Sequence, residues 1–371
     1  MTHRHLRLPS HVLQRYALGL ARDRALAPEP DSAAAKRRRF LVRRLRHAGI
    51  KGWPERQTLY TRNLPKGCRP CLQGRGSNLV MTLLCNRECF FCFNPKPRVS
   101  GMSVHGCEVR GPKEAAELLA GLGVKSVGIS GGEPLLEKRK VLALARGLRG
   151  RFGKGLRIDL YTNADLLTLR LLRSLKAAGV DGLRMNLAAN GYGTRPVALA
   201  RQVFDDVEVE IPAIPEHKDR VLRLMGELER MGCRHLILHE LFSSAQNVDA
   251  LARQGRRAKA GPRPAGLTWS AVAGSEETAL GLLGEALERK LRLSVYYCSC
   301  GTQSWIAERA GARRQSSPSR RSKRRSPCAD GAGRPSKVGK AAATIRLAAT
   351  AAVMGRLPSS ASTPRRLFTP A

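Results

Sequence analysis

The stretch NLVMTLLCNRECFFC (residues 78–92) runs from an apolar segment directly into three closely spaced cysteines. Its first seven residues are mostly apolar, which is typical of a buried β-strand. Cys85, Cys89 and Cys92 follow with the spacing C-x3-C-x2-C. Three thiols this close together can reach one metal centre from a single loop, and thiolates are the ligands of iron–sulfur sites. The stretch therefore predicts a strand that ends in a metal-binding loop.

The number of cysteines in this loop is informative. A [4Fe–4S] cluster held entirely by protein uses four thiolates, so a triplet would leave one iron open to a ligand from outside the chain. The spacing alone also fits a zinc knuckle, or thiols that only pack in the core.

Apolar runs alternate with helical patterns from residue 78 onward. The predicted strands are 78–84, 125–130, 156–163, 182–188, 207–214 and 235–241, and the predicted helices between them are 113–121, 135–148, 165–178, 195–203 and 217–232. Parallel neighbours need crossovers of a dozen or more residues, so this alternation predicts an α/β fold with a parallel sheet, either doubly wound or an open or closed barrel. A helix near 275–290 and a strand over 291–297 follow.

The chain of 371 residues is 42% hydrophobic and carries a formal net charge of +37. That length and composition predict a globular protein with a sizeable core, and the charge excludes a strongly acidic one. The excess is uneven: residues 1–66 carry +12, residues 67–310 carry +12 over a much longer segment, and residues 311–371 carry +13. Most of the charge therefore belongs to the two ends.

These shifts in composition divide the chain into three predicted parts. Residues 1–66 form a basic helical N-terminal extension with helices over 10–22 and 33–48, and residues 67–310 form the α/β domain. Residues 311–371 are rich in Arg, Ser, Pro and Gly, and they are predicted to be a disordered tail because they bury too little apolar surface. No apolar window is long enough for a membrane span and no signal peptide is evident, so we expect a soluble, cytoplasmic protein without membrane contact.

A second motif, Ser130-Gly131-Gly132-Glu133-Pro134, ends the second predicted strand. Paired glycines let a ligand approach the backbone closely, and Glu133 adds a carboxylate. By itself the motif is equally typical of an ordinary strand-to-helix turn with proline at the start of the helix.

Together the two motifs resemble the radical S-adenosylmethionine (radical SAM) superfamily. Its hallmark is C-x3-C-x2-C with an aromatic residue before the last cysteine, here Phe91, followed one β/α unit later by Gly-Gly-Glu-Pro. The resemblance implies a partial (β/α)6 barrel of the TIM type with active-site groups at the C-terminal ends of the strands. It also implies that Cys85, Cys89 and Cys92 hold a [4Fe–4S] cluster whose open iron binds S-adenosylmethionine.

The resemblance extends to cofactor-binding residues. It implies that Gly131, Gly132 and Glu133 form the turn that binds the methionine part of the cofactor. Asn163, at the end of one strand, and Asn186, at the end of the next, lie where family members often place polar groups toward the cofactor. The alternative for both asparagines is that they cap strand ends.

The implied reaction is reductive cleavage of S-adenosylmethionine to a 5′-deoxyadenosyl radical, which abstracts a hydrogen from a substrate that the sequence does not identify. It requires an electron donor such as flavodoxin or ferredoxin, and RNA and protein remain open as substrates. Residues 60–310 resemble uncharacterised radical SAM proteins related to pyruvate formate-lyase activating enzyme. The alternative is a zinc-binding, nucleic-acid-binding protein without enzymatic activity, which leaves the strand pattern unexplained.

Four further cysteines form two close pairs. Cys68 and Cys71 have C-x2-C spacing, and Cys298 and Cys300 have C-x-C spacing near the other end of the α/β domain. An open barrel can bring its two ends together, so one hypothesis is a second site that binds zinc or a second iron–sulfur cluster. The alternatives are a redox-active pair or ordinary thiols.

Overall fold

The computed structural model describes residues 25–30, 33–105, 107–260 and 269–316. The strands are β1 (Lys51–Trp53), β2 (Thr58–Tyr60), β3 (Gly76–Thr82), β4 (Ser100–Val104), β5 (Cys107–Val109), β6 (Ser126–Gly131), β7 (Arg157–Thr162), β8 (Gly182–Met185), β9 (Val207–Ala213), β10 (His235–Glu240), β11 (Phe242–Ser243), β12 (Ser270–Ala271) and β13 (Ser294–Cys298). The α-helices are α2 (Ala33–His47), α3 (Cys68–Leu72), α4 (Pro112–Gly121), α5 (Lys138–Phe152), α6 (Leu169–Ala177), α7 (Arg195–Arg201), α8 (Lys218–Arg230), α9 (Val248–Arg253), α10 (Ser275–Glu288) and α11 (Cys300–Ser316).

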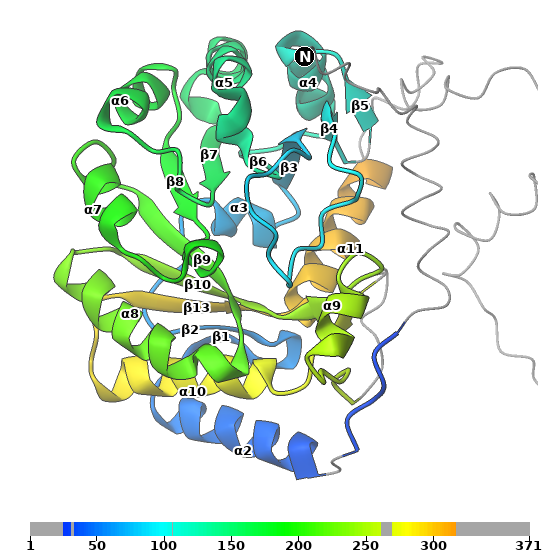
Figure 1. Cartoon of the computed structure of the whole chain (residues 1–371), viewed down its shortest axis with the longest axis vertical. Helices are drawn as coiled ribbons and strands as arrows, with labels where there is room; N and C mark the ends of the chain where they lie inside the picture. The colour runs from blue at the N-terminus through cyan, green and yellow to red at the C-terminus, as the bar shows by residue number, and fades with distance from the viewer. Residues whose placement is uncertain (1–24, 31–32, 106, 261–268, 317–371) are drawn as a thin grey trace, which may run out of the picture. The chain divides into compact units, whose positions relative to one another are not determined.

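One large sheet organises the described part of the chain (Figure 1). Its strand order is β1-β2-β13-β10-β9-β8-β7-β6-β3-β4-β5, and every neighbouring pair from β13 to β3 is parallel. The edge strands β1 and β5 are not paired with each other, so the sheet is an open, partial barrel. The predicted α/β fold is thus confirmed, with β13 as a seventh parallel strand.

The predicted strands and crossover helices correspond to elements of the structure within a few residues. The strands form because short apolar runs are bounded by Gly, Pro and polar residues, and the helices form because apolar residues recur at helical spacing. Helix α6 illustrates how the starts are fixed: Thr168 accepts a hydrogen bond from the backbone N–H of Leu171 at 3.2 Å.

The two faces of the sheet have opposite character. Side chains such as Ile129, Leu160 and Leu183 pack against the surrounding helices in the main hydrophobic core. Alternate residues of the same strands point to the concave side, where the structure places charged and polar groups, because side chains along a strand alternate between faces. The concave side is therefore the polar one, and it leads to the C-terminal strand ends that the sequence singled out.

Both edges of the sheet contain strands that the sequence did not predict. Strand β2 pairs with β13 and β4 pairs with β3, each antiparallel. Residues 51–53 and 58–60 therefore belong to the main sheet, and the predicted helical extension 1–66 contains two of its strands. The predicted boundary at residue 311 falls inside α11. Residues 10–22 and 317–371 lie outside the described residues.

The predicted helix 33–48 is present as α2, which packs against α10. Its Arg38 is buried and forms ion pairs with Glu29 at 3.0 Å and Glu277 at 2.9 Å. Arg38 of α2 thus links the N-terminal segment, which contains Glu29, to α10, which contains Glu277. Among the described helices, none has the length and apolar character needed to cross a bilayer.

Candidate active site

The cysteine loop begins where β3 ends. The Gly-Gly-Glu turn begins at the last residue of β6, Asn163 follows β7 and Asn186 follows β8. These strands are parallel neighbours, so their C-terminal ends lie at the same end of the barrel. The fold thereby brings the predicted cofactor residues to the same edge of the barrel.

The three thiols of the loop are partly exposed and close enough to influence one another. Burial raises the pKa of Cys89 to about 11, and the neighbouring Cys92 and Cys85 raise it further, whereas two arginines oppose the shift. A bound metal ion or cluster would displace these protons, because thiolates are the ligating form. In the described ranges, no group of three or more His, Cys, Asp or Glu side chains is already arranged to hold a metal ion. Cluster binding by this loop therefore requires side-chain rearrangement and stays a prediction.

The loop is fastened to the end of β7. Arg87 forms two hydrogen bonds with the carboxylate of Asp165, at 2.6 and 2.8 Å. Asn86 donates to the same carboxylate at 2.8 Å and accepts a hydrogen bond from the side chain of Asn163 at 2.7 Å. The hydrogen bond from Arg87 is the largest influence that lowers the pKa of Asp165. These contacts fix the loop between its first two cysteines.

The paired glycines allow the turn after β6 to pack directly on the start of the cysteine loop. Gly132 donates to the carbonyl of Thr82 at 2.7 Å, and Glu133 donates to that of Leu84 at 2.7 Å. A Cβ atom at Gly131 would collide with the carbonyl oxygen of Thr82, and one at Gly132 with that of Leu84. Gly131 also has φ +130°, which favours glycine. The glycines are thus required by packing, whatever they bind.

The side chain of Glu133 is fully buried and points into the protein. One carboxylate oxygen accepts hydrogen bonds from the backbone N–H of Leu135 at 3.0 Å and the hydroxyl of Thr162 at 2.9 Å, and the other accepts from the backbone N–H of Asn163 at 2.7 Å. Burial is the main cause of its raised pKa. The Glu133 carboxylate therefore joins β6 to β7 and is not free to contact a ligand.

Two buried amide oxygens near these strand ends have no hydrogen-bond donor among the described residues. They are the side-chain oxygens of Asn186 and of Asn190, whose amide nitrogen donates to the carbonyl of Asn163 at 3.2 Å. Buried acceptors are normally satisfied, so both fit a ligand that carries amine or hydroxyl donors. Asn190 was not predicted. The available signal was the Asn190-Gly191 pair after β8, where Gly191 has φ +80°.

The concave side below this edge holds a buried charge cluster that sequence reasoning missed. Arg184 on β8 pairs with Glu208 at 2.9 Å and Glu210 at 2.8 Å, both on β9. Glu210 also bonds the ring of His239 at 2.6 Å, and its pKa is lowered to about 2, with Arg184 the largest of the lowering influences. The alternation Val-Glu-Val-Glu-Ile in β9 was the signal, because a strand between helices and a polar interior alternates in this way.

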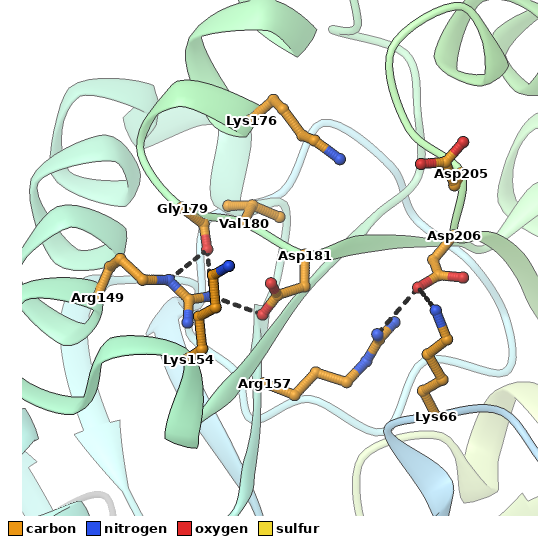
Figure 2. Close-up of a pocket in the computed structure, with 10 residues that line it drawn as sticks. All are labelled: Lys66, Arg149, Lys154, Arg157, Lys176, Gly179, Val180, Asp181, Asp205 and Asp206. Atoms are coloured by element: carbon orange, nitrogen blue, oxygen red, sulfur yellow. Dashed lines mark hydrogen bonds and ion pairs between the residues drawn. The ribbon is translucent and has the colours of Figure 1, made fainter.

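A cavity of about 390 Å³ lies at the other end of the barrel, where the strands begin, beside the first residue of β7 (Figure 2). Its cations are largely engaged with acids: Arg149 pairs with Asp181 at 2.6 Å, and Lys66 and Arg157 pair with Asp206 at 2.8 and 3.1 Å. Basic side chains at this edge also complement the C-terminal ends of the helices. The cavity is separate from the cysteine loop, which follows the other end of the strands.

The four cysteines of the two close pairs are distributed over α3, β13 and α11. Cys68 and Cys298 pack in one buried cluster, and Cys71 lies on α3 with Cys68, whereas the backbone N–H of Cys300 donates to Glu240 at 2.8 Å. The predicted second metal site stays a prediction, because no three of these thiols are already arranged to hold a metal ion in the described part of the chain.

The structure is an open α/β barrel. A cysteine-rich loop follows its first parallel strand, and a glycine turn follows the next one. These two features define the class of protein. Residues 79–191 match the model of the radical SAM superfamily, so this part of the chain is similar to that superfamily.

Two relatives and one solved structure show the range of similarity. A protein of Methanocaldococcus jannaschii, provisionally named a glycyl-radical enzyme activating enzyme, is 29% identical over 247 residues, which are 63% of each chain. A GTP 3′,8-cyclase of Synechococcus sp. is 29% identical over 170 residues, 41% of this chain and 48% of the cyclase. SuiB of Streptococcus suis bound to S-adenosylmethionine has 13% identity and a TM-score of 0.43, over 70% of this chain and 54% of SuiB. The chain thus spans less than two thirds of the length of these curated relatives.

Proposed function

We propose that this protein is a radical SAM enzyme in which Cys85, Cys89 and Cys92 hold a [4Fe–4S] cluster. When bound and reduced, the cluster supplies the electron that cleaves S-adenosylmethionine to methionine and a 5′-deoxyadenosyl radical, which abstracts a hydrogen from the substrate. The observation that carries the proposal is the gathering of three partly exposed thiols beside the glycine turn and two unsatisfied amide oxygens.

The chain's own residues position the reactants. Arg87 and Asp165 hold the cysteine loop against the end of β7. The backbone of Gly131 and Gly132 provides a surface without side chains, against which the methionine part of the cofactor can lie. Asn186 and Asn190 offer acceptors for its amine and hydroxyl groups. The buried carboxylate of Glu133 contributes indirectly, by holding the turn in place.

The proposed reaction needs a one-electron donor, for which flavodoxin or ferredoxin is the proposed class, and the reducing cytoplasm as its compartment. A protein substrate is favoured because one relative is named an activating enzyme of glycyl-radical enzymes. A substrate made of RNA is the competing class.

The test is anaerobic reconstitution with iron and sulfide, followed by reduction in the presence of S-adenosylmethionine. We expect a brown protein with about four irons per chain that releases 5′-deoxyadenosine. Cys89→Ala should lose both the colour and the product. Cys233→Ala is the matched control, because Cys233 is buried in the hydrophobic core away from the loop and should keep both. A colourless zinc protein that binds nucleic acid would overturn the proposal.

A further inference from the structure

A surface patch of aromatic and basic side chains lies where β1 and α11 approach each other. This tryptophan patch consists of Trp53, Arg56, Trp305 and Arg309. The ring centroids of the two tryptophans are 5.6 Å apart. Both guanidiniums lie over the Trp305 ring, that of Arg56 at 4.7 Å and that of Arg309 at 5.4 Å from its centroid. Segments from the beginning and the end of the described chain thus build one patch.

The two guanidiniums of the patch are available to an anion. Arg56 and Arg309 are exposed, and among the described residues neither forms an ion pair with a carboxylate. Their acidic neighbours Glu55 and Glu308 are exposed and extend into solvent without pairing with them. Contact with an aromatic face orients a guanidinium but leaves its charge in place. The patch therefore presents two oriented positive charges.

The patch also presents an aromatic ring to solvent. Trp53 is 39% exposed, and every residue of its strand β1 is exposed. An indole ring at the surface is a stacking face for another planar group, and stacking on it needs no particular hydrogen-bond pattern. Trp53 thus adds a site for a planar group next to the two charges.

The backbone under the patch is fixed by packing. The hydroxyls of Thr58 and Thr302 are buried and form a hydrogen bond of 2.7 Å, and the Thr302 hydroxyl also donates to the carbonyl of Arg56 at 3.4 Å. Farther along α11, a Cβ atom at Gly74 would lie 2.7 Å from the backbone nitrogen of Ala310, so the segment after α3 packs directly on this helix. Since both segments are already held together, little ordering is required when a ligand binds.

The patch begins at the same end of the barrel as the cysteine loop. Trp53 pairs with Thr58 of β2, and Thr58 pairs with Cys298, the last residue of β13. Strand β13 runs parallel to β10 and its neighbours, so Trp53 lies at the end of the barrel where the parallel strands finish. A ligand on the patch is therefore bound on the side of the barrel that carries the candidate active site.

The charge of the chain around the patch complements a polyanion. Residues 1–66, which carry +12, supply Trp53 and Arg56, and residues 311–371, which carry +13, follow Arg309 in the sequence. A polyanion with planar groups between its charges matches both features of the patch, because phosphates pair with guanidiniums and bases stack on indole rings. A single strand fits better than a duplex, in which the faces of the bases are already stacked on one another.

We propose that the tryptophan patch binds single-stranded nucleic acid, with a base stacked on Trp53 and neighbouring phosphates paired with Arg56 and Arg309. Trp305 holds the two guanidiniums in place. An acidic protein segment would use the charges alone and leave the exposed Trp53 ring without a role. This surface does not depend on the proposed cluster, and its ligand is distinct from the question of which substrate the radical attacks.

The first test separates stacking from charge. Full-length protein is titrated at physiological salt with fluorescently labelled oligouridylate of about twelve nucleotides, and with an abasic oligomer of the same length and charge. We expect oligouridylate to bind about 10-fold or more tightly than the abasic oligomer. Trp53→Ala should remove most of this difference. Phe40→Ala, which removes another exposed aromatic ring, on α2, should retain it.

The second test measures the contribution of charge. The double variant Arg56→Ala, Arg309→Ala should lower the slope of log affinity against log salt concentration by about 1.4, the value for two lost phosphate contacts on a single strand. The matched control Arg173→Ala, Arg223→Ala removes the same charge from exposed positions of α6 and α8 and should keep the wild-type slope.

The altered side chains are exposed, so circular dichroism should show wild-type melting temperatures for all variants. Equal affinity of the wild-type protein for the two oligomers would rule out this surface as a nucleic-acid site. A full preference for oligouridylate in Trp53→Ala, or equal slopes for the two double variants, would also rule it out. Trp53→Ala should still release 5′-deoxyadenosine after reconstitution, so failure of this surface and failure of the proposed function are distinguishable.

Discussion

The backbone N–H of Asn163 donates a hydrogen bond to the carboxylate of Glu133 at 2.7 Å, so the ends of two neighbouring strands are joined by one buried side chain. The same carboxylate also holds Leu135 and Thr162. The acidic residue of the Gly-Gly-Glu-Pro motif is therefore a structural support for the turn, and the backbone ahead of it is the part that faces the cysteine loop.

Glu133→Gln should destabilise the fold by about 1–3 kcal/mol, because the amide nitrogen replaces one of two oxygens that both accept hydrogen bonds and leaves a buried donor unsatisfied. Urea denaturation followed by circular dichroism measures the change. Glu117→Gln, at an exposed position of α4, should change the free energy of unfolding by less than about 0.5 kcal/mol. Equal stability of the Glu133→Gln and wild-type chains would contradict the structural role.

Gly132→Ala should cost about 1–3 kcal/mol of unfolding free energy, since its Cβ atom would meet the backbone carbonyl of Leu84, which cannot move independently of the loop. Gly150→Ala is the matched control: it lies inside α5 with open space around it, and alanine should stabilise the helix by about 0.5–1 kcal/mol. The two substitutions should thus shift the melting temperature in opposite directions. A neutral Gly132→Ala would show that the turn and loop can separate freely.

Asp165→Asn should affect the cysteine loop more than global stability. The Arg87–Asp165 pair is partly exposed, with Arg87 43% accessible, so its loss should cost under about 1 kcal/mol. The loosened loop should release iron faster to a chelator, followed by the loss of visible colour after reconstitution. Asp219→Asn, exposed on α8, should release iron at the wild-type rate. Identical rates for both variants would mean that this pair does not hold the loop.

His235 should make stability depend on pH. Burial is the main cause that lowers its pKa from 6.5 to about 4, and its ring bonds the side chain of Asn63 at 2.6 Å. As the pH falls, the unfolded chain takes up a proton on His235 before the folded chain does. The contribution of His235 to the free energy of unfolding is therefore fully present above pH 6.5 and is lost as the pH falls from 6.5 to about 4. The slope should reach about 1.4 kcal/mol per pH unit in that window.

His235→Asn should remove this part of the slope, which denaturation at a series of pH values measures. His47→Asn, at the exposed end of α2, controls for the loss of an imidazole and should keep the wild-type slope. An unchanged slope in His235→Asn would show that His235 is as accessible to protons in the folded chain as in the unfolded one.

Most of the parallel sheet was predictable from the sequence because its strands are local apolar patterns separated by helices. The edge strands were not. Strand β2 has only three residues, and it forms because β13 presents a free edge to it, a partner more than two hundred residues away. The concave charges around Arg184 were missed for a related reason: the residues that neutralise it lie on other strands.

The candidate site also contains some features that the sequence predicts and others that it does not. The spacing of Cys85, Cys89 and Cys92 restricts them to one loop, whatever the rest of the fold does. The role of Glu133 depended on what lies next to β6, and the unsatisfied oxygen of Asn190 can be recognised only once its surroundings are known.

The sequence by itself determined the order of the parallel strands and their crossover helices, the cysteine loop and the glycine turn, because those features depend on neighbours along the chain. Only the tertiary structure decided that Cys298 packs in one cluster with Cys68 while Cys300 packs in another. Two residues apart on a continuous strand, Cys298 and Cys300 would share a face, but β13 ends at Cys298 and α11 begins at Cys300. After that change of backbone direction, Cys298 packs in the cluster that contains Cys68, whereas Cys300 packs with Phe242 and Ala271.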